Sequence, residues 1–149
     1  MKTFRFRSTL LLFLFIGYFF INFNACSKKG DPTPASTLKS SIVASWNVSS
    51  LTQAGIEVMG ILYNSQVLKF DAYSTDHGTA VFTTKVFDGS TQVENYTYVV
   101  NEATNEVTIK DTYGLAIIAK VTLSDGDNKM EWTDTEITGQ ELKRLATKQ

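Results

Sequence analysis

The stretch EVTIKDTYGLAIIAKVTLSDGDNKMEWTD, residues 106–134, decides the fold class. In this stretch, short runs rich in Val, Ile and Thr alternate with turn sequences built from Asp, Gly and Asn. The turns at 111–114 and 124–128 separate three runs whose lengths and compositions are typical of β-strands. The stretch therefore predicts consecutive antiparallel hairpins.

The same pattern extends outward over most of the chain. We expect eight strands, at residues 42–50, 66–73, 79–87, 91–100, 106–110, 114–123, 128–134 and 137–146. The last seven are joined by short links, which favours a meander over a Greek-key sandwich with its long connection between sheets. Because closure into a barrel removes both sheet edges, we expect an all-β fold, an eight-stranded antiparallel meander barrel.

The first link, residues 51–65, is the long one, and we expect it to form a lid beside the barrel mouth. Within it, residues 53–63 have apolar side chains at a helical spacing. Gly55 and Gly60 oppose a stable helix in the same segment. Both a flap and a short helix therefore stay open as interpretations.

Alternation along the expected strands predicts which side chains point inward. The bulky ones are Trp46, Phe70, Phe82, Tyr96, Tyr98, Met130 and Trp132; the smaller ones are Val48, Leu68, Ala80, Val100, Val107, Ile109, Ile117, Ala119, Val121, Leu123 and Leu142. An eight-stranded barrel is just wide enough to be filled by its own side chains or to hold one small ligand. The seven bulky residues therefore form either a solid core or the lining of a cavity for a small hydrophobic molecule.

The N-terminal segment differs from the rest of the chain. Three basic residues precede an apolar run at 10–23, which is too short for the roughly 20 residues of a membrane-spanning helix. This pattern is typical of a secretory signal peptide. The single Cys of the protein, Cys26, follows Ala25 directly after this run, and it has no second Cys for an internal disulfide.

The sequence FNAC at residues 23–26 resembles the lipobox of bacterial lipoproteins, and the residues that follow resemble lipoproteins of the Bacteroidetes type. The resemblance implies a lipoprotein signal peptide at 1–25 and a lipidated Cys26 that anchors the protein in the outer membrane. The anchored protein would belong to the cell envelope, on either the periplasmic or the surface face. Ordinary secretory cleavage after Ala25 and an uncleaved anchor stay open as alternatives.

Residues 26–40 contain both prolines among Ser, Thr, Lys and Gly, a composition that predicts a flexible linker and leaves 41–149 as the folded domain. Without residues 1–25 the chain has 11 basic and 15 acidic side chains, a formal charge of -4. This balance argues against a nucleic-acid partner and against electrostatic attraction to anionic lipid. We therefore expect the lipid on Cys26 to make the membrane contact.

The sequence VASWNV, residues 43–48, resembles the G-x-W signature of lipocalins, and residues 40–146 resemble the lipocalin-like domains of Bacteroidetes lipoproteins. The resemblance implies a barrel that binds a small hydrophobic ligand. It also implies an Arg placed over the Trp of the first strand. Arg144, the one Arg after the signal peptide, would then stack on Trp46 and close the barrel floor; an exposed Arg144 is the alternative.

The sequence contains no motif that indicates an enzyme, a cofactor or a metal site. His77 stands beside Asp76 in an expected turn and lacks a Ser or Cys nucleophile motif. Residues 125–128 have calcium-ligand side chains without the spacing of an EF-hand loop, which favours a hairpin turn. We expect a solvated face for the acidic residues Glu131, Asp134, Glu136 and Glu141.

These observations together predict a non-enzymatic, membrane-anchored envelope lipoprotein whose barrel binds a small hydrophobic ligand. The alternative is a structural or interaction module with a filled barrel, which would dock onto another envelope protein. An internal pocket would favour the first hypothesis, and a filled barrel with an exposed apolar patch would favour the second.

Overall fold

The computed structural model describes residues 36–135 and 139–149. The expected signal peptide 1–25, Cys26 and the first part of the expected linker lie outside the described residues. The elements are α2 (Leu38–Ser41), β1 (Ser45–Gln53), β2 (Ile56–Glu57), β3 (Tyr63–Phe70), β4 (Gly78–Val86), β5 (Thr91–Asn101), β6 (Glu106–Lys110), β7 (Ala116–Ser124), β8 (Lys129–Thr135) and β9 (Glu141–Lys148).

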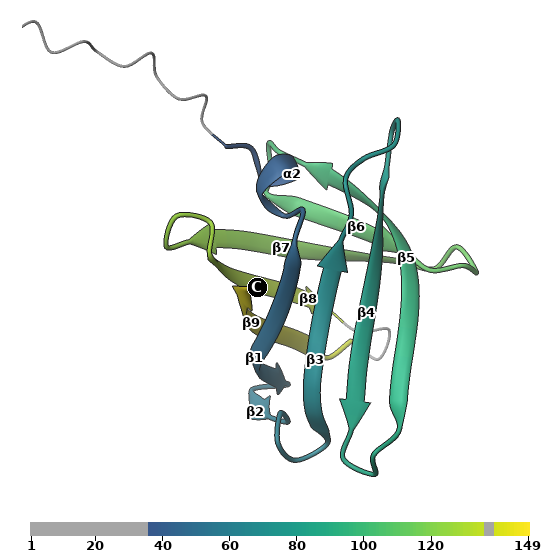
Figure 1. Cartoon of the computed structure of the whole chain (residues 1–149), viewed down its shortest axis with the longest axis vertical. Helices are drawn as coiled ribbons and strands as arrows, with labels where there is room; N and C mark the ends of the chain where they lie inside the picture. The colour runs from purple at the N-terminus through teal and green to yellow at the C-terminus, as the bar shows by residue number, and fades with distance from the viewer. Residues whose placement is uncertain (1–35, 136–138) are drawn as a thin grey trace, which may run out of the picture. The chain divides into compact units, whose positions relative to one another are not determined.

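The strands form one antiparallel sheet in the order β2-β1-β3-β4-β5-β6-β7-β8-β9, and β1 also pairs with β9. This last pairing closes eight strands into a barrel and leaves β2 as a short extra strand on β1. The expected eight-stranded meander barrel is confirmed, and each expected strand overlaps an observed one. In Figure 1, β1, β3, β4 and β5 run along the long axis, and β6 to β9 cross behind them.

The barrel has two ends that differ in structure. At the end where β1 begins lie α2 and the turns at 71–77, 102–105 and 125–128; we call it the closed end. At the end where β1 finishes lie β2 and the turns at 87–90 and 111–115; we call it the mouth. In Figure 1 the label α2 marks the closed end and β2 marks the mouth.

Aromatic side chains fill the closed half of the barrel. Phe70 lies at the centre, with ring-centroid distances of 5.2 Å to Tyr98, 5.7 Å to Trp132 and 5.8 Å to Phe82. Tyr98 fits because its strand neighbour Gly78 lacks a side chain: a Cβ there would lie 2.2 Å from the Tyr98 ring. All side chains expected to point inward are buried or half-buried, so the alternation is confirmed.

The short helix α2 covers the closed end. The carboxylate of Glu102 accepts hydrogen bonds from the backbone N–H groups of Leu38 and Lys39, at 2.9 and 2.7 Å. These N–H groups stand in the first turn of the helix, where no backbone acceptor is available. Asp127 in the β7–β8 turn accepts a hydrogen bond from Ser41 at 2.6 Å. Turns from two hairpins thus hold the helix in place.

The core also reaches into the expected linker. Ile42 is fully buried and Leu38 is 8% exposed, and the indole nitrogen of Trp46 donates to the Ile42 carbonyl at 2.9 Å. Residues 36–40 therefore belong to the folded barrel, and the expected boundary at 40/41 lies too late. The physical reason is that this apolar pair, four residues apart, outweighs the Ser- and Thr-rich composition around it.

The segment 53–63 is a hairpin followed by a turn. β1 continues to Gln53, Ala54 and Gly55 take positive φ angles of 49° and 80°, and Ile56–Glu57 pairs back on β1. Of the two interpretations of this segment, the flap is confirmed and the helix is wrong, because backbone pairing with β1 is available to it.

We expect the loss of buried surface at α2 to weaken the whole fold. Ile42→Ala should lower the free energy of unfolding by about 2–5 kcal/mol, because it leaves a cavity in a packed site. Ile56→Ala is a matched control, since Ile56 is 67% exposed, and it should change stability by about 0.5 kcal/mol or less. Urea unfolding followed by tryptophan fluorescence measures both. Equal effects of the two substitutions would show that α2 is not part of the core.

A pocket with a polar floor at the barrel mouth

A pocket of about 380 Å³ occupies the half of the barrel next to the mouth. All eight barrel strands contribute to its lining, which consists of Leu51, Tyr63, Gln66, Phe82, Thr84, Gln92, Glu94, Tyr96, Ile109, Ile117, Asp134, Leu142 and Arg144. The volume falls within the range of roughly 300–1,000 Å³ that is typical of small-molecule sites. The barrel is therefore packed at one end and hollow at the other.

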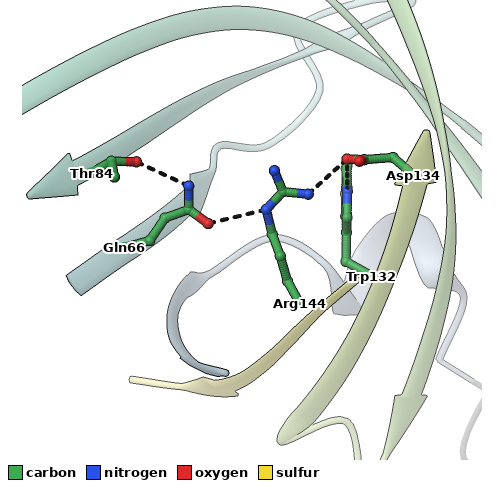
Figure 2. Close-up of polar contacts among 5 residues, drawn as sticks. All are labelled: Gln66, Thr84, Trp132, Asp134 and Arg144. Atoms are coloured by element: carbon green, nitrogen blue, oxygen red, sulfur yellow. Dashed lines mark hydrogen bonds and ion pairs between the residues drawn. The ribbon is translucent and has the colours of Figure 1, made fainter. Parts of the chain in front are cut away.

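The floor of the pocket is a row of hydrogen-bonded polar side chains (Figure 2). Thr84 accepts from the Gln66 amide nitrogen at 2.9 Å, and the Gln66 oxygen accepts from Nε of Arg144 at 3.0 Å. Nη1 of Arg144 donates to Oδ2 of Asp134 at 2.7 Å, and Trp132 Nε1 donates to the same oxygen at 2.7 Å. The row connects β4, β3, β9 and β8 through the barrel interior.

The position of Arg144 follows from strand register. It pairs with Leu51 on β1 and with Trp132 on β8, so its side chain points inward. Its bond to Gln66 joins β9 to β3 across β1, the strand that separates them. Arg144 is 8% exposed and Asp134 is 5% exposed, so the ion pair is buried. Burial of two charges is tolerated when they pair closely and their remaining bonds are satisfied.

Arg144 lines the pocket, and one nitrogen of its guanidinium has no hydrogen-bond partner among the described residues. Nε and Nη1 of Arg144 make the bonds described above, whereas Nη2 has no hydrogen-bond partner within residues 36–135 and 139–149 (Figure 2). An N–H group of this kind can donate a hydrogen bond to a bound molecule. The floor thus offers a fixed donor at the base of a partly apolar cavity.

The rim of the pocket on β5 is polar and exposed. Glu94 pairs with the inward-facing Phe82, and Gln92 pairs with the inward-facing Thr84, so both point toward the pocket. Burial, and then the negative charge of Glu94, raise the pKa of Tyr96 to about 12. A phenol is neutral at physiological pH even with its ordinary pKa, and the raised pKa of Tyr96 keeps it neutral at more alkaline pH as well.

The structure separates the seven bulky residues expected to line a cavity. Phe82 and Tyr96 line the pocket, whereas Trp46, Phe70, Tyr98, Met130 and Trp132 pack with one another and with smaller side chains toward the closed end. The barrel has a solid core in the half next to the closed end and a cleft in the half next to the mouth, so each of the two alternatives describes one half. The pocket is also more polar than a cavity lined by the seven bulky residues would be.

The expected contact of Arg144 with Trp46 is wrong. The cation over the Trp46 ring is Lys148, whose Nζ lies 5.3 Å from the ring centroid and also donates to the Ser41 carbonyl at 3.2 Å. Trp46 pairs with Lys148, and Arg144 stands four residues earlier on β9, about 13 Å along the strand. Both side chains have the same parity on β9, so alternation alone did not distinguish them.

Sequence reasoning missed the polar residues of the floor and rim. Gln66, Thr84, Glu94 and Asp134 each stand two positions from an aliphatic or aromatic residue that was expected to point inward. If the alternation is continued by one more inward position along each strand, it predicts that all four polar side chains point inward. Asp134 in particular was expected on a solvated face and is buried instead, because Arg144 and Trp132 provide its hydrogen bonds.

The expected turns at His77 and at residues 125–128 are turns in the structure. Nδ1 of His77 lies 2.7 Å from Oδ1 of Asp76 in the turn between β3 and β4. This turn is at the closed end of the barrel, whereas the pocket is at the mouth. Residues 125–128 form the β7–β8 turn, in which Asp125, Gly126 and Asp127 have positive φ angles. Within the described ranges, no group of three or more His, Cys, Asp or Glu side chains is placed to hold a metal ion.

The floor makes a prediction about stability. Arg144→Met should lower the free energy of unfolding by about 3–5 kcal/mol, because it leaves the Asp134 charge buried and without its ion pair. Lys143→Met is the neighbouring control: Lys143 forms a surface pair with Glu131 at 2.8 Å, and its loss should cost about 1 kcal/mol or less. Chemical unfolding of both variants tests this. A cost for Arg144→Met no greater than that for Lys143→Met would contradict it.

Comparison with known proteins supports the fold. No family model and no curated protein matches the chain. Among solved structures, a redesigned β-barrel has a TM-score of 0.56 at 14% identity, covering 77% of this chain and 97% of its own. The siderocalin Ex-FABP, described as functioning through dual ligand specificities, has a TM-score of 0.54 at 10% identity, covering 74% and 75%. The redesigned barrel mFAP1, bound to DFHBI, has a TM-score of 0.51 at 14% identity, covering 76% and 100%. At these identities the likeness shows the fold alone, a lipocalin-like β-barrel.

Proposed function

We propose that this protein is a non-enzymatic binding protein of the bacterial cell envelope, which holds a small molecule in the pocket at the barrel mouth. The observation that carries the proposal is the pocket itself, a cavity of about 380 Å³ above a polar floor. A barrel used only as a rigid module has no need of a buried ion pair at the base of an open cavity, because apolar residues of similar volume are often as stabilising.

The lining indicates an amphipathic ligand. Leu51, Ile109, Ile117 and Leu142 offer apolar surface, and the polar floor and rim offer hydrogen-bond donors and acceptors. Sites for small molecules combine these two kinds of surface, the apolar part for affinity and a few fixed polar groups for orientation. Two of the solved barrels of similar fold, the siderocalin Ex-FABP with its dual ligand specificities and mFAP1 bound to DFHBI, are ligand-binding proteins, which is consistent with this use of the fold.

The proposed lipid anchor would be connected to the closed end of the barrel. The described chain begins at Ser36, whose hydroxyl donates to Asp127 at 2.6 Å at the closed end. A lipid on Cys26 would therefore attach to the barrel at the end away from the mouth. Within the described residues no helix is long and apolar enough to cross a bilayer, and the lipid is our proposed means of membrane attachment.

The pocket hypothesis predicts the effect of filling the cavity. Full-length protein extracted from its own membranes should carry a small molecule that native mass spectrometry detects, and Ile117→Trp should lose it. Ile118→Trp is the matched control, because Ile118 is the adjacent residue and is 61% exposed on the outer face. Leu142→Trp provides a second pocket-filling variant if Ile117→Trp folds poorly. Retention of the molecule by both pocket-filling variants would contradict binding at this site.

The anchor hypothesis makes a separate prediction. Cells given a labelled fatty acid should incorporate the label into the wild-type protein, and Cys26→Ser should abolish incorporation and release the protein from the membrane fraction. Ser27→Ala is the control and should leave both unchanged. Membrane retention of unlabelled Cys26→Ser would favour the uncleaved anchor, and secretion of unlabelled wild type would favour ordinary cleavage.

A second candidate function has support from one surface. Ile61, Leu62 and Phe87 are exposed beside the mouth, and the backbone N–H of Phe87 donates to the Leu62 carbonyl at 2.9 Å. Adjacent exposed apolar side chains of this kind occur at protein-binding sites. If docking onto an envelope protein is the main function, Phe87→Ser should release that partner, and Ile117→Trp should not.

A further inference from the structure

The charges of the pocket lining have an acidic excess. Among the lining residues, Glu94 and Asp134 carry negative charge and Arg144 carries positive charge, and no Lys belongs to the lining. A bound molecule therefore meets two carboxylates and one guanidinium. The excess charge lies at the rim, because Asp134 is paired with Arg144 at 2.7 Å and Glu94 is exposed on β5.

Arg144 is poorly placed to bind an anion. Its charge is offset by Asp134 in direct contact, and its Nε is occupied by Gln66. An anionic group that approached Nη2 would also approach the Asp134 carboxylate, and like charges at short range in a partly buried site repel strongly. The remaining N–H corner instead suits a neutral acceptor, such as a hydroxyl, carbonyl or ether oxygen.

A second carboxylate near the rim is that of Asp111, in the turn that follows β6. Asp111 follows Ile109 at the same strand parity, and its carboxylate accepts from the backbone N–H groups of Tyr113 and Leu115 at 2.8 Å each. After burial and the negative charge of Glu94, the charge of Asp111 also raises the pKa of Tyr96, whereas the charge of Arg144 lowers it. Two acidic side chains therefore act on Tyr96, Glu94 from the same strand and Asp111 from the turn after the neighbouring strand β6.

Aromatic rings complete this side of the pocket. The rings of Phe82 and Tyr96 lie 4.9 Å apart between centroids, and Tyr63 adds a third ring to the lining. The faces of aromatic rings attract cations, most strongly where water is partly excluded. The carboxylate of Glu94 attracts a cation at the rim, and the aromatic side chains beside it can add to that attraction.

We propose that the pocket selects a small amphiphile that bears a positively charged amine and rejects the corresponding carboxylate. The ammonium lies at the rim beside Glu94 and Tyr96, and the apolar body lies against Ile117 and the other aliphatic side chains. A hydrogen-bond acceptor on the ligand can reach Nη2 of Arg144. This inference rests on the proposed binding function and adds the charge of the ligand to it.

Three probes with the same apolar body test the inference: 2-phenylethylamine, 2-phenylethanol and phenylacetate. Isothermal titration calorimetry with the full-length protein should show the amine binding about tenfold more tightly than phenylacetate, with the alcohol between them. The preference should weaken as salt is added, because the rim is exposed to solvent. The full-length protein is titrated in detergent, into which the probes can partition. The same titration with Ile117→Trp, whose pocket is filled, measures the heat of that partition, which is then subtracted.

The role of Glu94 has its own variant and control. Glu94→Gln should lower the ratio of amine affinity to alcohol affinity about fivefold, because it removes the rim charge and keeps the shape of the side chain. Glu141→Gln should leave the ratio unchanged, because Glu141 also lies at the mouth end but is exposed and outside the pocket lining. Equal loss in both variants would point to general surface charge and overturn the proposed site.

The outcomes separate this inference from the proposed function. Phenylacetate binding as tightly as the amine would overturn the charge selection while it supports a binding pocket. An amine preference that Glu94→Gln does not change would overturn the role of the rim. Absence of binding by all three probes would overturn the inference, and the detection of a native ligand by mass spectrometry would still decide the function separately.

Discussion

The buried ion pair between Arg144 and Asp134 is the constraint on which the rest of the barrel depends. Removal of both charges from water costs several kcal/mol per ion, so the pair persists only where the remaining bonds are satisfied. Gln66, Thr84 and Trp132 provide or complete these bonds from three strands. Because the polar side chains occupy inward positions on four strands, aromatic packing ends at their level and the pocket begins there.

Most of the fold could be predicted from two local signals. Strand alternation placed residues such as Tyr98 and Trp132 in the core, and turn sequences such as 125–128 placed the hairpins. Closure was expected because short links favour a meander, and closing a meander into a barrel removes both of its edges. The helix α2 was missed because Leu38 and Ile42 are two apolar residues in a polar segment, and their burial depends on Trp46 and on turns far away in sequence.

Much less of the site could be predicted, because it depends on register and on pairs of polar residues. Arg144 and Lys148 share one strand face, and only the pairing of β9 with β1 decides which of them lies over Trp46. Asp134 looked like a solvated acid because its partner is ten residues away on the next strand. Hydrophobic alternation identifies apolar neighbours, whereas a buried polar residue is explained only by the partner that satisfies it.

The two ends of the barrel suit two separate tasks. An anchor at Cys26 would join the barrel ten residues later, at Ser36 on the closed end, within a reach of roughly 35 Å. The mouth, at the far end of the same strands, would then be free of the attachment point. An ammonium group raises the solubility of a small molecule in water, so a ligand of the proposed class could reach the mouth from the aqueous phase. The proposed preference for an amine and the proposed anchor on Cys26 would then both favour a ligand taken from the aqueous phase.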